Sequence, residues 1–346
     1  EELRRAAERA ASMYEALESL IECFEAARGH GLDPSRECEG ILAYEPERAR
    51  FLVEVGGTRF WVVSGESPDK VIVRLYREAG EAEAKARRAA RAKEELLDKL
   101  RAAELKAAAR RIQEKARGRK RWWFERYHWT ITRGGLIAIG GRDAGQNESI
   151  VRRYLEDRDV FLHAEIHGGS AVVLKTGGRE PSPGDLEDAA VLAVAYSKAW
   201  KSGLGSLQAY WVLGSQVSKS PPSGEYLARG AFMVYGRKNY LKPIQLRLSI
   251  GIALATDGAP VVFVGSREAS EAYTIGYAVI APGDSRVEEC AADIKKGLVE
   301  AFPEELKPLA MAVDETEIAS RLPGRCTLLR VATRRGGPPG RLPVVS

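Results

Sequence analysis

The chain has 346 residues, of which 45% are hydrophobic, a composition typical of a folded protein with a sizeable core. Its formal net charge is +5, and no apolar run reaches the ~18 residues of a membrane span. The composition therefore excludes a disordered chain, and the charged N-terminal segment has no signal-peptide core. We expect a soluble, cytoplasmic protein.

Positive charge is concentrated in one segment, residues 77–121. This segment carries 16 Lys and Arg residues and 8 Asp and Glu residues, so the rest of the chain is slightly acidic. A local basic excess indicates a polyanionic partner rather than a general contribution to solubility.

The four cysteines are Cys23, Cys38, Cys290 and Cys326. None of them forms a C-x-x-C pair, so the spacing indicates neither a zinc ribbon nor a disulfide framework. We therefore expect reduced thiols.

The N-terminal third predicts a helix pair with a β-rich insert. Apolar residues from Leu3 to Phe24 alternate at spacings of three and four, which predicts a coiled-coil helix over residues 1–28. The pattern begins without a cap, so we expect the helix to continue from an upstream segment. A small β-rich module over 29–75 follows, with a hairpin at Gly56-Gly57 and a last strand at Val71 to Leu75. The Ala-rich segment 76–121 predicts a second helix, antiparallel to the first; a lone solvated helix is the alternative.

The remaining chain predicts an α+β domain over 122–255, a C-terminal α/β extension over 256–332, and a flexible tail over 333–346. The extension either continues the same domain or forms a small lobe. Helices are expected at Gln146 to Glu156, at Leu186 to Lys201, and from Asp284 or Ser285 to Ala301. The expected strands include Tyr127 to Thr132, Leu136 to Ile139, Val160 to Ile166, Ala171 to Lys175, Leu207 to Leu213, Ala231 to Tyr235, Ile244 to Ile252, Val261 to Val264, Tyr277 to Ile280 and Thr327 to Val331.

A Gly140-Gly141 turn between a strand and a helix carries a cluster of polar side chains. Arg142, together with backbone amides at the start of the helix, is suited to hold a phosphate. Arg152 and Arg153 add charge on the same helix. In the alternative interpretation, Asp143 caps the helix while Gln146 and Asn147 fix the turn, and both interpretations can hold together.

His163, Glu165 and His167 alternate along a predicted strand and would share one face. Such a face could hold a divalent metal, which makes a metal-dependent hydrolase one alternative function. A polar recognition surface and a structural network are the other interpretations. The sequence contains no Walker P-loop, no G-x-G-x-x-G and no G-x-S-x-G elbow.

Two polar loops follow neighbouring strands. One runs from Gln216 to Tyr226 and includes Lys219; the other is the turn Gly236 to Asn239. Together they resemble loops that follow a sugar-phosphate backbone; a basic loop that serves only solubility is the alternative. The aromatic residues from Trp122 to Trp129 are expected in the core rather than stacked on bases.

Together these segments resemble the NFACT family, which comprises NEMF-, Caliban- and RqcH-type proteins, with an archaeal character. The strings that carry the resemblance are WWFERYHWTITRGGLIAIGGRDAGQNESIVRRYL, DVFLHAEIHGGSAVVLK, AYSKAW and QVSKSPPSGEYLARGAFMVYGRKN. They cover residues 122–250, the region known in the family as NFACT-R. The upstream helices and β insert are similar to the family's coiled-coil middle region.

The resemblance implies a non-enzymatic factor of ribosome-associated quality control that needs no cofactor. Its implied partners are the obstructed large ribosomal subunit (rRNA and stalk-base proteins), tRNA and the stalled nascent-chain complex, and its implied role is to support untemplated alanine-type C-terminal tailing. A coiled-coil protein scaffold is a further alternative. The residues expected to bind nucleic acid are Arg142, Asp143, Gln146, Asn147, Arg152, Arg153, His163, His167, Lys175, Lys219, Arg237, Lys238 and Asn239. The residues expected to form a basic ribosome arm are Arg87, Arg88, Arg91, Arg110 and Arg111.

Overall fold

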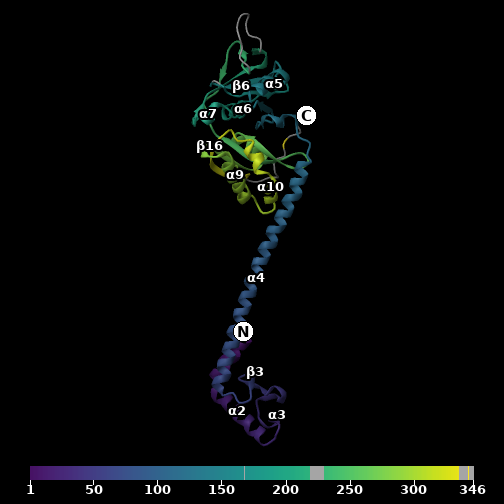
Figure 1. Cartoon of the computed structure of the whole chain (residues 1–346), viewed down its shortest axis with the longest axis vertical. Coiled ribbons are helices and arrows are strands. Elements are labelled where there is room, and N and C mark those ends of the chain that lie inside the picture. The colour runs from purple at the N-terminus through teal and green to yellow at the C-terminus, as the bar shows by residue number, and fades with distance from the viewer. Residues whose placement is uncertain (167, 219–229, 335–341, 343–346) are drawn as a thin grey trace. The chain divides into compact units, whose positions relative to one another are not determined.

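The computed structural model describes residues 1–166, 168–218, 230–334 and 342, and divides the chain into two compact units, Glu1–Arg101 and Ala102–Ser346. Helix α4 (Pro68–Arg117) contains the boundary between the units (Figure 1). Both units include α-helices and antiparallel sheets, so the predicted α+β class is confirmed. No helix in the described part of the chain is long and apolar enough to cross a membrane.

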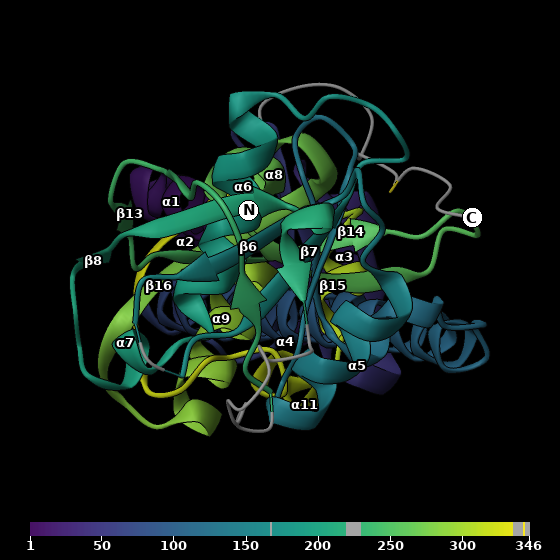
Figure 2. The ribbon, with the colours of Figure 1, turned by 90° about the horizontal axis from the view of Figure 1, so that it is seen from above.

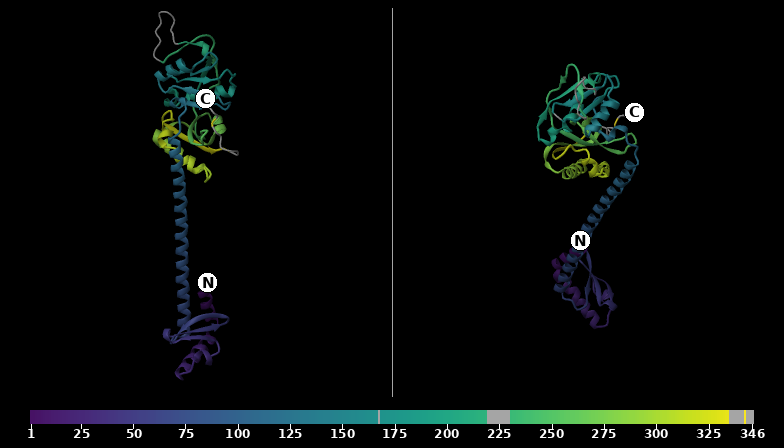
Figure 3. Two further views of the ribbon diagram at one scale, coloured as in Figure 1. Left: turned by 90° about the vertical axis from the view of Figure 1, so that its right-hand side faces the viewer. Right: turned by 45° about the horizontal axis from the view of Figure 1, so that its top comes forward.

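The N-terminal unit is a small antiparallel sheet, of order β1-β2-β3, packed against helices (Figure 3). Gly56 and Gly57 have φ values of 57° and 75°, which a tight hairpin requires, and the predicted hairpin is confirmed. The core of this unit includes Leu17, Phe24 and Phe51. Its elements are α1 (Glu2–Ser12), α2 (Tyr14–Gly29), α3 (Pro34–Glu37), β1 (Ile41–Glu45), η1 (Pro46–Arg48), β2 (Arg50–Val55), β3 (Thr58–Val63) and the first part of α4.

Two expectations for this unit are wrong. Residues 71–75 are not a strand but lie in α4, where Val71 and Leu75 are spaced four apart and both face the core. Pro68 stands at the first position of that helix, where its missing N–H costs nothing. The first helix is broken at Met13 into α1 and α2 rather than continuous over 1–28.

The predicted pairing of the first helix with 76–121 extends only as far as Glu83. Tyr14 donates a hydrogen bond to Asp69 at 3.0 Å, and Arg4 lies 3.4 Å from Glu83, so the two segments run antiparallel there. Beyond that point residues 84–104 are all exposed, including Leu96 at 68% and Leu100 at 54%. For residues 84–104 the alternative of a solvated helix therefore holds.

The expectation of reduced thiols is also wrong. Two disulfides are present: Cys23–Cys38 joins α2 to the residue after α3, and Cys290–Cys326 joins α9 (Val287–Ala301) to β17 (Cys326–Thr333). The cysteines lie 15 and 36 residues apart in sequence, with Cα atoms 6.0 and 6.3 Å apart. Tertiary packing brings each pair together, which spacing alone does not reveal.

The second unit contains a six-stranded antiparallel sheet of order β12-β9-β6-β7-β5-β4. Leu162 of β6 packs with α6 in one core cluster, whereas its neighbour Phe161 packs with α5 in another, so the two helices cover opposite faces (Figure 2). The elements are β4 (His128–Ile131), β5 (Ile137–Gly140), α5 (Ala144–Tyr154), β6 (Val160–Ala164), β7 (Ala171–Lys175), α6 (Pro183–Ala195), β9 (Ala209–Leu213) and β12 (Asn239–Tyr240).

A second sheet of order β15-β14-β16-β17 shares its core with the first. Its strand pair β14 and β15 crosses the expected boundary at 255/256, and both sheets belong to the same compact unit. The C-terminal segment therefore continues the preceding domain and forms no separate lobe. The elements are β14 (Leu248–Leu254), β15 (Pro260–Gly265), α8 (Arg267–Tyr273), β16 (Thr274–Ser285), α9, α10 (Lys307–Ala312), α11 (Glu315–Ala319) and β17.

Several boundaries differ from the predicted ones. The helix expected at Leu186 to Lys201 is two helices, because Ser197 begins a new one by accepting a hydrogen bond from the Ala199 amide at 3.2 Å. The cap of α9 is Arg286 rather than Asp284 or Ser285. Short elements complete the described chain: η2 (Trp123–Arg126), α7 (Lys198–Lys201), β8 (Ser206–Leu207), η3 (Gly214–Gln216), β10 (Val217–Ser218), β11 (Met233–Val234) and β13 (Ile244–Gln245).

Buried charge connects the C-terminal helices to the start of the first sheet. Arg321 is 7% exposed and donates to the carbonyls of Glu125 and Tyr127 at 3.3 and 3.4 Å. Glu125 in turn pairs with Arg119 at 2.7 Å. Of the aromatic cluster that the sequence placed in the core, Phe124, Tyr127 and Trp129 are buried around this network, whereas Trp122 and Trp123 are half-buried.

His128 lies beside this network and stacks on Tyr196 with ring centroids 3.5 Å apart. Burial, with smaller contributions from Arg142 and Arg321, lowers the pKa of His128 to about 3. At neutral pH the imidazole is therefore uncharged.

We predict that acid destabilises the fold through His128. Below its ordinary pKa of 6.5 the unfolded chain binds a proton that the folded chain does not accept until about pH 3, so stability falls as pH falls through that window. At about 1.4 kcal/mol per pH unit, lowering the pH from 6.5 to 5 should cost roughly 2 kcal/mol. Urea unfolding at both pH values should show this loss in the native chain and a smaller one in His128→Phe, which keeps a ring but cannot titrate. Equal losses in both proteins would contradict the assignment.

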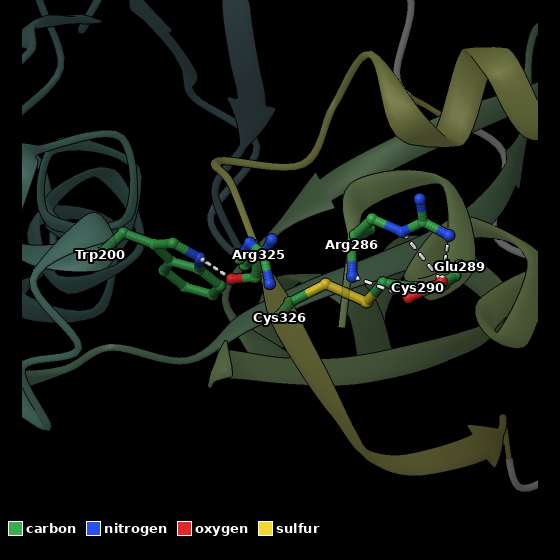
Figure 4. The surroundings of a disulfide bond; sticks show 6 residues. All are labelled: Trp200, Arg286, Glu289, Cys290, Arg325 and Cys326. Carbon is green, nitrogen blue, oxygen red and sulfur yellow. Dashed lines mark hydrogen bonds and ion pairs between the residues drawn. A yellow bond between two sulfur atoms is a disulfide. The ribbon is translucent and has the colours of Figure 1, made fainter. Parts of the chain in front are cut away.

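We also predict that the Cys290–Cys326 disulfide stabilises the second unit. It joins α9 to the first residue of β17, next to the bond from Trp200 Nε1 to the Arg325 carbonyl at 2.9 Å (Figure 4). Closing a loop of this length should contribute about 4 kcal/mol. Thermal unfolding of the Cys290→Ala/Cys326→Ala variant should occur well below that of the native chain, and a reductant should lower the Tm of the native chain more than that of the variant, which retains only Cys23–Cys38. If a thiol assay detects two free thiols in the unreduced native protein and none in the variant, Cys290 and Cys326 are not paired.

Candidate nucleic-acid interface

The turn before α5 is built from its own polar side chains. The Asp143 carboxylate accepts a hydrogen bond from the Gln146 amide at 2.8 Å, and the Gln146 side chain accepts one from the Arg142 amide at 3.2 Å. Asn147 is 9% exposed, and its Oδ1 accepts from the Ala171 amide at 3.2 Å. For Asp143, Gln146 and Asn147 the interpretation as cap and turn residues therefore holds.

Gly141 permits this arrangement because no side chain fits at its position. A Cβ there would lie 2.3 Å from Asn147 Oδ1 and 2.5 Å from the Asn147 amide nitrogen. The Ser170 hydroxyl also donates to the Gly141 carbonyl at 2.9 Å. The turn and the start of β7 therefore form one hydrogen-bonded unit.

Arginines around this turn have no carboxylate partner in the described part of the chain. Arg142, Arg152 and Arg153 are exposed and form no ion pair there. The amides of Ala144 and Gly145, in the first turn of α5, precede the first intrahelical bonds. The phosphate hypothesis thus depends on Arg142 and these two amides.

The sheet face covered by α5 continues into a line of rings. His163 pairs with Tyr210 across β6 and β9, and Tyr210 pairs with Tyr240 across β9 and β12. Ring centroids are 5.9 Å apart for the first pair and 6.0 Å for the second. We call these three residues the aromatic row.

The aromatic row ends beside a lysine. Lys238 Nζ lies 4.1 Å from the Tyr210 ring centroid, in cation–π contact. Tyr210 is 7% exposed, whereas Tyr240 is 51% exposed. The row thus presents a flat ring to solvent next to a positive charge, an arrangement suited to a base and its phosphate.

The side chains of His163 and Tyr210 in the aromatic row are uncharged at neutral pH. Burial lowers the pKa of the His163 imidazole, so the ring is neutral at pH 7. Burial, with Glu165 and Tyr240 adding to it, raises the pKa of Tyr210 to about 12. Lys238 therefore supplies the charge, and His163 and Tyr210 supply polar, uncharged edges.

The proposed metal-binding strand face does not form as expected. Strand β6 ends at Ala164, so Glu165 lies in a bend rather than alternating with His163 along a strand. His167 lies outside the described residues. Among the residues that the structure describes, no group of three His, Cys, Asp or Glu side chains is placed to hold a metal ion.

Lys175 is occupied within the fold. Its Nζ forms an ion pair with Asp159, lies 3.1 Å from Glu156, and donates to the Tyr154 carbonyl at 2.8 Å. Because Asp159 is 1% exposed, this lysine compensates a buried carboxylate. We therefore leave Lys175 out of the proposed interface.

The second basic turn lies at the far end of the aromatic row. Arg237 is exposed, and Asn239 Nδ2 donates to the Trp211 carbonyl at 3.4 Å. Gln216 Nε2 donates to the Tyr235 carbonyl at 2.9 Å, which holds this turn against the preceding loop. Lys219 lies outside the described residues.

Sequence reasoning missed three residues near this face. Tyr210 and Tyr240 were not singled out, because their opposition to His163 depends on strand register. Lys198 is exposed at the start of α7, and a Cβ on Gly168 would lie 2.8 Å from its Cε. The available signal for Lys198 was Ser197, a cap residue that places the lysine in the first turn of a new helix.

The expected arm residues lie on α4. Arg87, Arg88, Arg91, Arg110 and Arg111 are all exposed. Arg87 lies 3.9 Å from Glu83, while Arg91, Arg110 and Arg111 form no ion pair in the described part of the chain.

Most of the segment that carries the aromatic row matches a known protein family. Residues 126–236 match the family described as "NFACT protein RNA binding domain". These residues are therefore similar to the RNA-binding domain of the NFACT family. The match includes the Gly141 turn, β6, β7 and β9, and it confirms the resemblance inferred from the sequence.

Curated relatives extend this finding. The archaeal Rqc2 homolog aRqcH of Methanocaldococcus jannaschii is 33% identical over 221 residues, which are 63% of this chain and 31% of that protein. The ribosome quality control complex subunit NEMF homolog of Drosophila melanogaster is 42% identical over 144 residues, 41% of this chain and 14% of that protein. NEMF of Homo sapiens is 42% identical over 142 residues, 41% of this chain and 13% of that protein. The chain thus matches less than a third of each of these relatives.

We predict that Gly141→Ala disrupts the turn. The added Cβ would displace Asn147 from the Ala171 amide, at a cost of about 1–3 kcal/mol for overpacking. Urea unfolding should show this loss, whereas the control Gly205→Ala, with no heavy atom within 4 Å of its added Cβ, should be nearly neutral. Equal stability of the two variants would contradict the close packing at Gly141.

Proposed function

We propose that this chain binds RNA through two basic sites, which together we call the RNA face: Arg142 at the turn before α5, and the aromatic row with Arg237 and Lys238. The cation–π contact between Lys238 and Tyr210 carries the proposal, because it places a positive charge beside the exposed ring of Tyr240. Aromatic rings stack on bases of any sequence, and neighbouring cations hold the backbone phosphates. The match of residues 126–236 to an RNA-binding domain supports the assignment.

Ion pairing separates the arginines of this face from several other basic residues of the second unit. Arg119 and Arg133 pair with Glu125 and Asp188, both at 2.7 Å, and Lys175 pairs with Asp159. Arg142 and Arg237 have no such partner in the described residues and remain exposed. Cations without internal partners can neutralise phosphates without losing an existing interaction.

We further propose that the chain is part of a ribosome-associated quality control factor with a non-enzymatic role. Its relatives are named as ribosome quality control complex subunits, and one as an archaeal Rqc2 homolog. In this proposal the factor works in the cytoplasm, binds obstructed large ribosomal subunits and tRNA, and supports untemplated C-terminal tailing of stalled chains. The exposed α4 residues Arg91, Arg110 and Arg111 supply additional contacts with rRNA.

The RNA face is tested by charge reversal. We expect Arg142→Glu/Arg237→Glu/Lys238→Glu to weaken binding to deacylated tRNA at least tenfold and to reduce the slope of log K against log salt by about 2–3, because three phosphate contacts are lost. Tm should change little, since Arg142 and Arg237 are exposed and none of the three forms an ion pair in the described chain.

The matched control is Arg158→Glu, an exposed arginine outside the proposed face with no ion pair in the described residues. It should leave affinity and salt slope close to those of the native chain. Fluorescence anisotropy across a salt series measures both quantities, and the same series with purified large subunits tests the ribosome contact. An equal effect of the triple variant and the control would refute the proposed face.

A further inference from the structure

The second unit contains a pocket of about 850 Å³ that shares only Tyr240 with the proposed RNA face. It lies between α6, the segment 240–247, and the sheet of β14, β16 and β17. Figure 2 labels α6, β13 and β16, which border it. Its volume is in the range that holds drug-sized ligands and cofactors.

An unsatisfied hydroxyl lines this pocket. Ser249 is 1% exposed, and its Oγ has no hydrogen-bond partner. A buried hydroxyl without a partner has lost its hydrogen bonds to water, so a ligand that supplies an acceptor or donor there would restore what folding removed.

Strand register places an arginine on the same face as Ser249. Ser249 pairs with Val279 across β14 and β16, and Val279 pairs with Arg330 across β16 and β17. Directly paired residues project from the same face of a sheet. Ser249 and Arg330 are two strands apart, roughly 10 Å between backbones, within reach of a long guanidinium side chain.

Charge is unevenly distributed around the pocket. Among its basic residues, Arg133 pairs with the buried Asp188 at 2.7 Å, and Arg267 pairs with Glu271 at 2.8 Å. A second group, Arg247, Arg330 and Lys242, is exposed and has no ion pair in the described part of the chain. The second group is available to an anion.

Apolar side chains form the remaining wall. Leu186 and Val191 come from α6, Ile244 from β13, and Leu329 from β17. Leu329 and Tyr240, which also line the pocket, are 49% and 51% exposed as whole residues. A ligand of this site therefore combines an anionic group with a flat or apolar body.

We propose that this pocket binds a nucleotide, with its phosphate held by Arg247, Arg330 and the Ser249 hydroxyl and its base against Leu186, Ile244 and Tyr240. Two arginines match the oxygens of a phosphate bidentately, and a buried hydroxyl adds a fixed donor. The choice of a nucleotide among phosphorylated compounds rests on the proposed RNA-binding function. The same chemistry is offered by a free nucleotide and by the 5′-terminal nucleotide of an RNA.

The experiment is calorimetric titration of the whole chain with AMP and GMP, with adenosine, and with a tetranucleotide that carries or lacks a 5′-phosphate. We expect saturable binding of one nucleotide per chain, at least tenfold weaker for adenosine than for AMP. Preference for the phosphorylated tetranucleotide over AMP would identify an RNA end as the ligand, and the reverse order would identify a free nucleotide.

Two variants test the location. Arg247→Ala/Arg330→Ala should weaken AMP binding at least tenfold, against the control Arg158→Ala. Ser249→Ala should weaken it at least threefold without lowering Tm, because the hydroxyl has no partner to lose. Ser270→Ala is its matched control, since Ser270 is also buried and unpartnered but does not line the pocket.

Failure of this proposal can be told apart from failure of the RNA face. Absence of AMP, GMP and tetranucleotide binding, or binding unaffected by both pocket variants, would overturn the nucleotide pocket. If tRNA binding still depended on Arg142, Arg237 and Lys238, the RNA face would stand without the pocket. If instead the pocket variants lost AMP while charge reversal left tRNA affinity unchanged, the pocket would stand and the RNA face would fall.

Discussion

The register of β6 between β7 and β9 is the constraint on which the fold of the second unit and the aromatic row depend. It directs Leu162 toward α6 and Phe161 toward α5, so a slip by one residue would turn each side chain toward the wrong core. The same register sets His163 opposite Tyr210 on one side and opposite Ala171 on the other. Because the Ala171 amide holds Asn147, the pairing that builds the core also positions the turn at Arg142. Packing and recognition thus share one set of backbone hydrogen bonds.

The features that were predicted correctly depend on residues that lie close together in the sequence. The Gly-Gly hairpin at Gly56, the cap at Asp143 and the strand from Ala171 to Lys175 were all predicted from the sequence, since each depends on neighbours within a few residues. Val71 to Leu75 was misassigned because apolar residues four apart also suit a helix once a core lies beside them. The pairing of Cys290 with Cys326 and the opposition of Tyr210 to His163 could not be predicted, because each joins segments that only the fold brings together.

Whether a basic residue already has an ion-pair partner in the fold separates residues that stabilise the protein from residues that can bind RNA. A count of charges in the sequence does not show this difference. A basic residue beside a buried carboxylate, such as Lys175 beside Asp159, has already given up its hydration in the folded state and stabilises the fold. A basic residue that remains hydrated and unpaired in the described chain, such as Arg142, can exchange water and counterions for phosphate. The sequence ranked Arg142 and Lys175 alike as RNA contacts, and only their surroundings separate them.

Tyr240 links the two proposed surfaces. It is the last residue of β12, an edge strand that pairs only with β9 in the six-stranded sheet. Its ring ends the aromatic row, and it also lines the pocket together with Leu241 and Ile244. An edge strand of two residues has few bonds to resist displacement, so a ligand that shifts this tyrosine in the pocket would alter the ring offered to RNA. Any such coupling would be reciprocal, since RNA stacked on Tyr240 must change nucleotide affinity by the same factor.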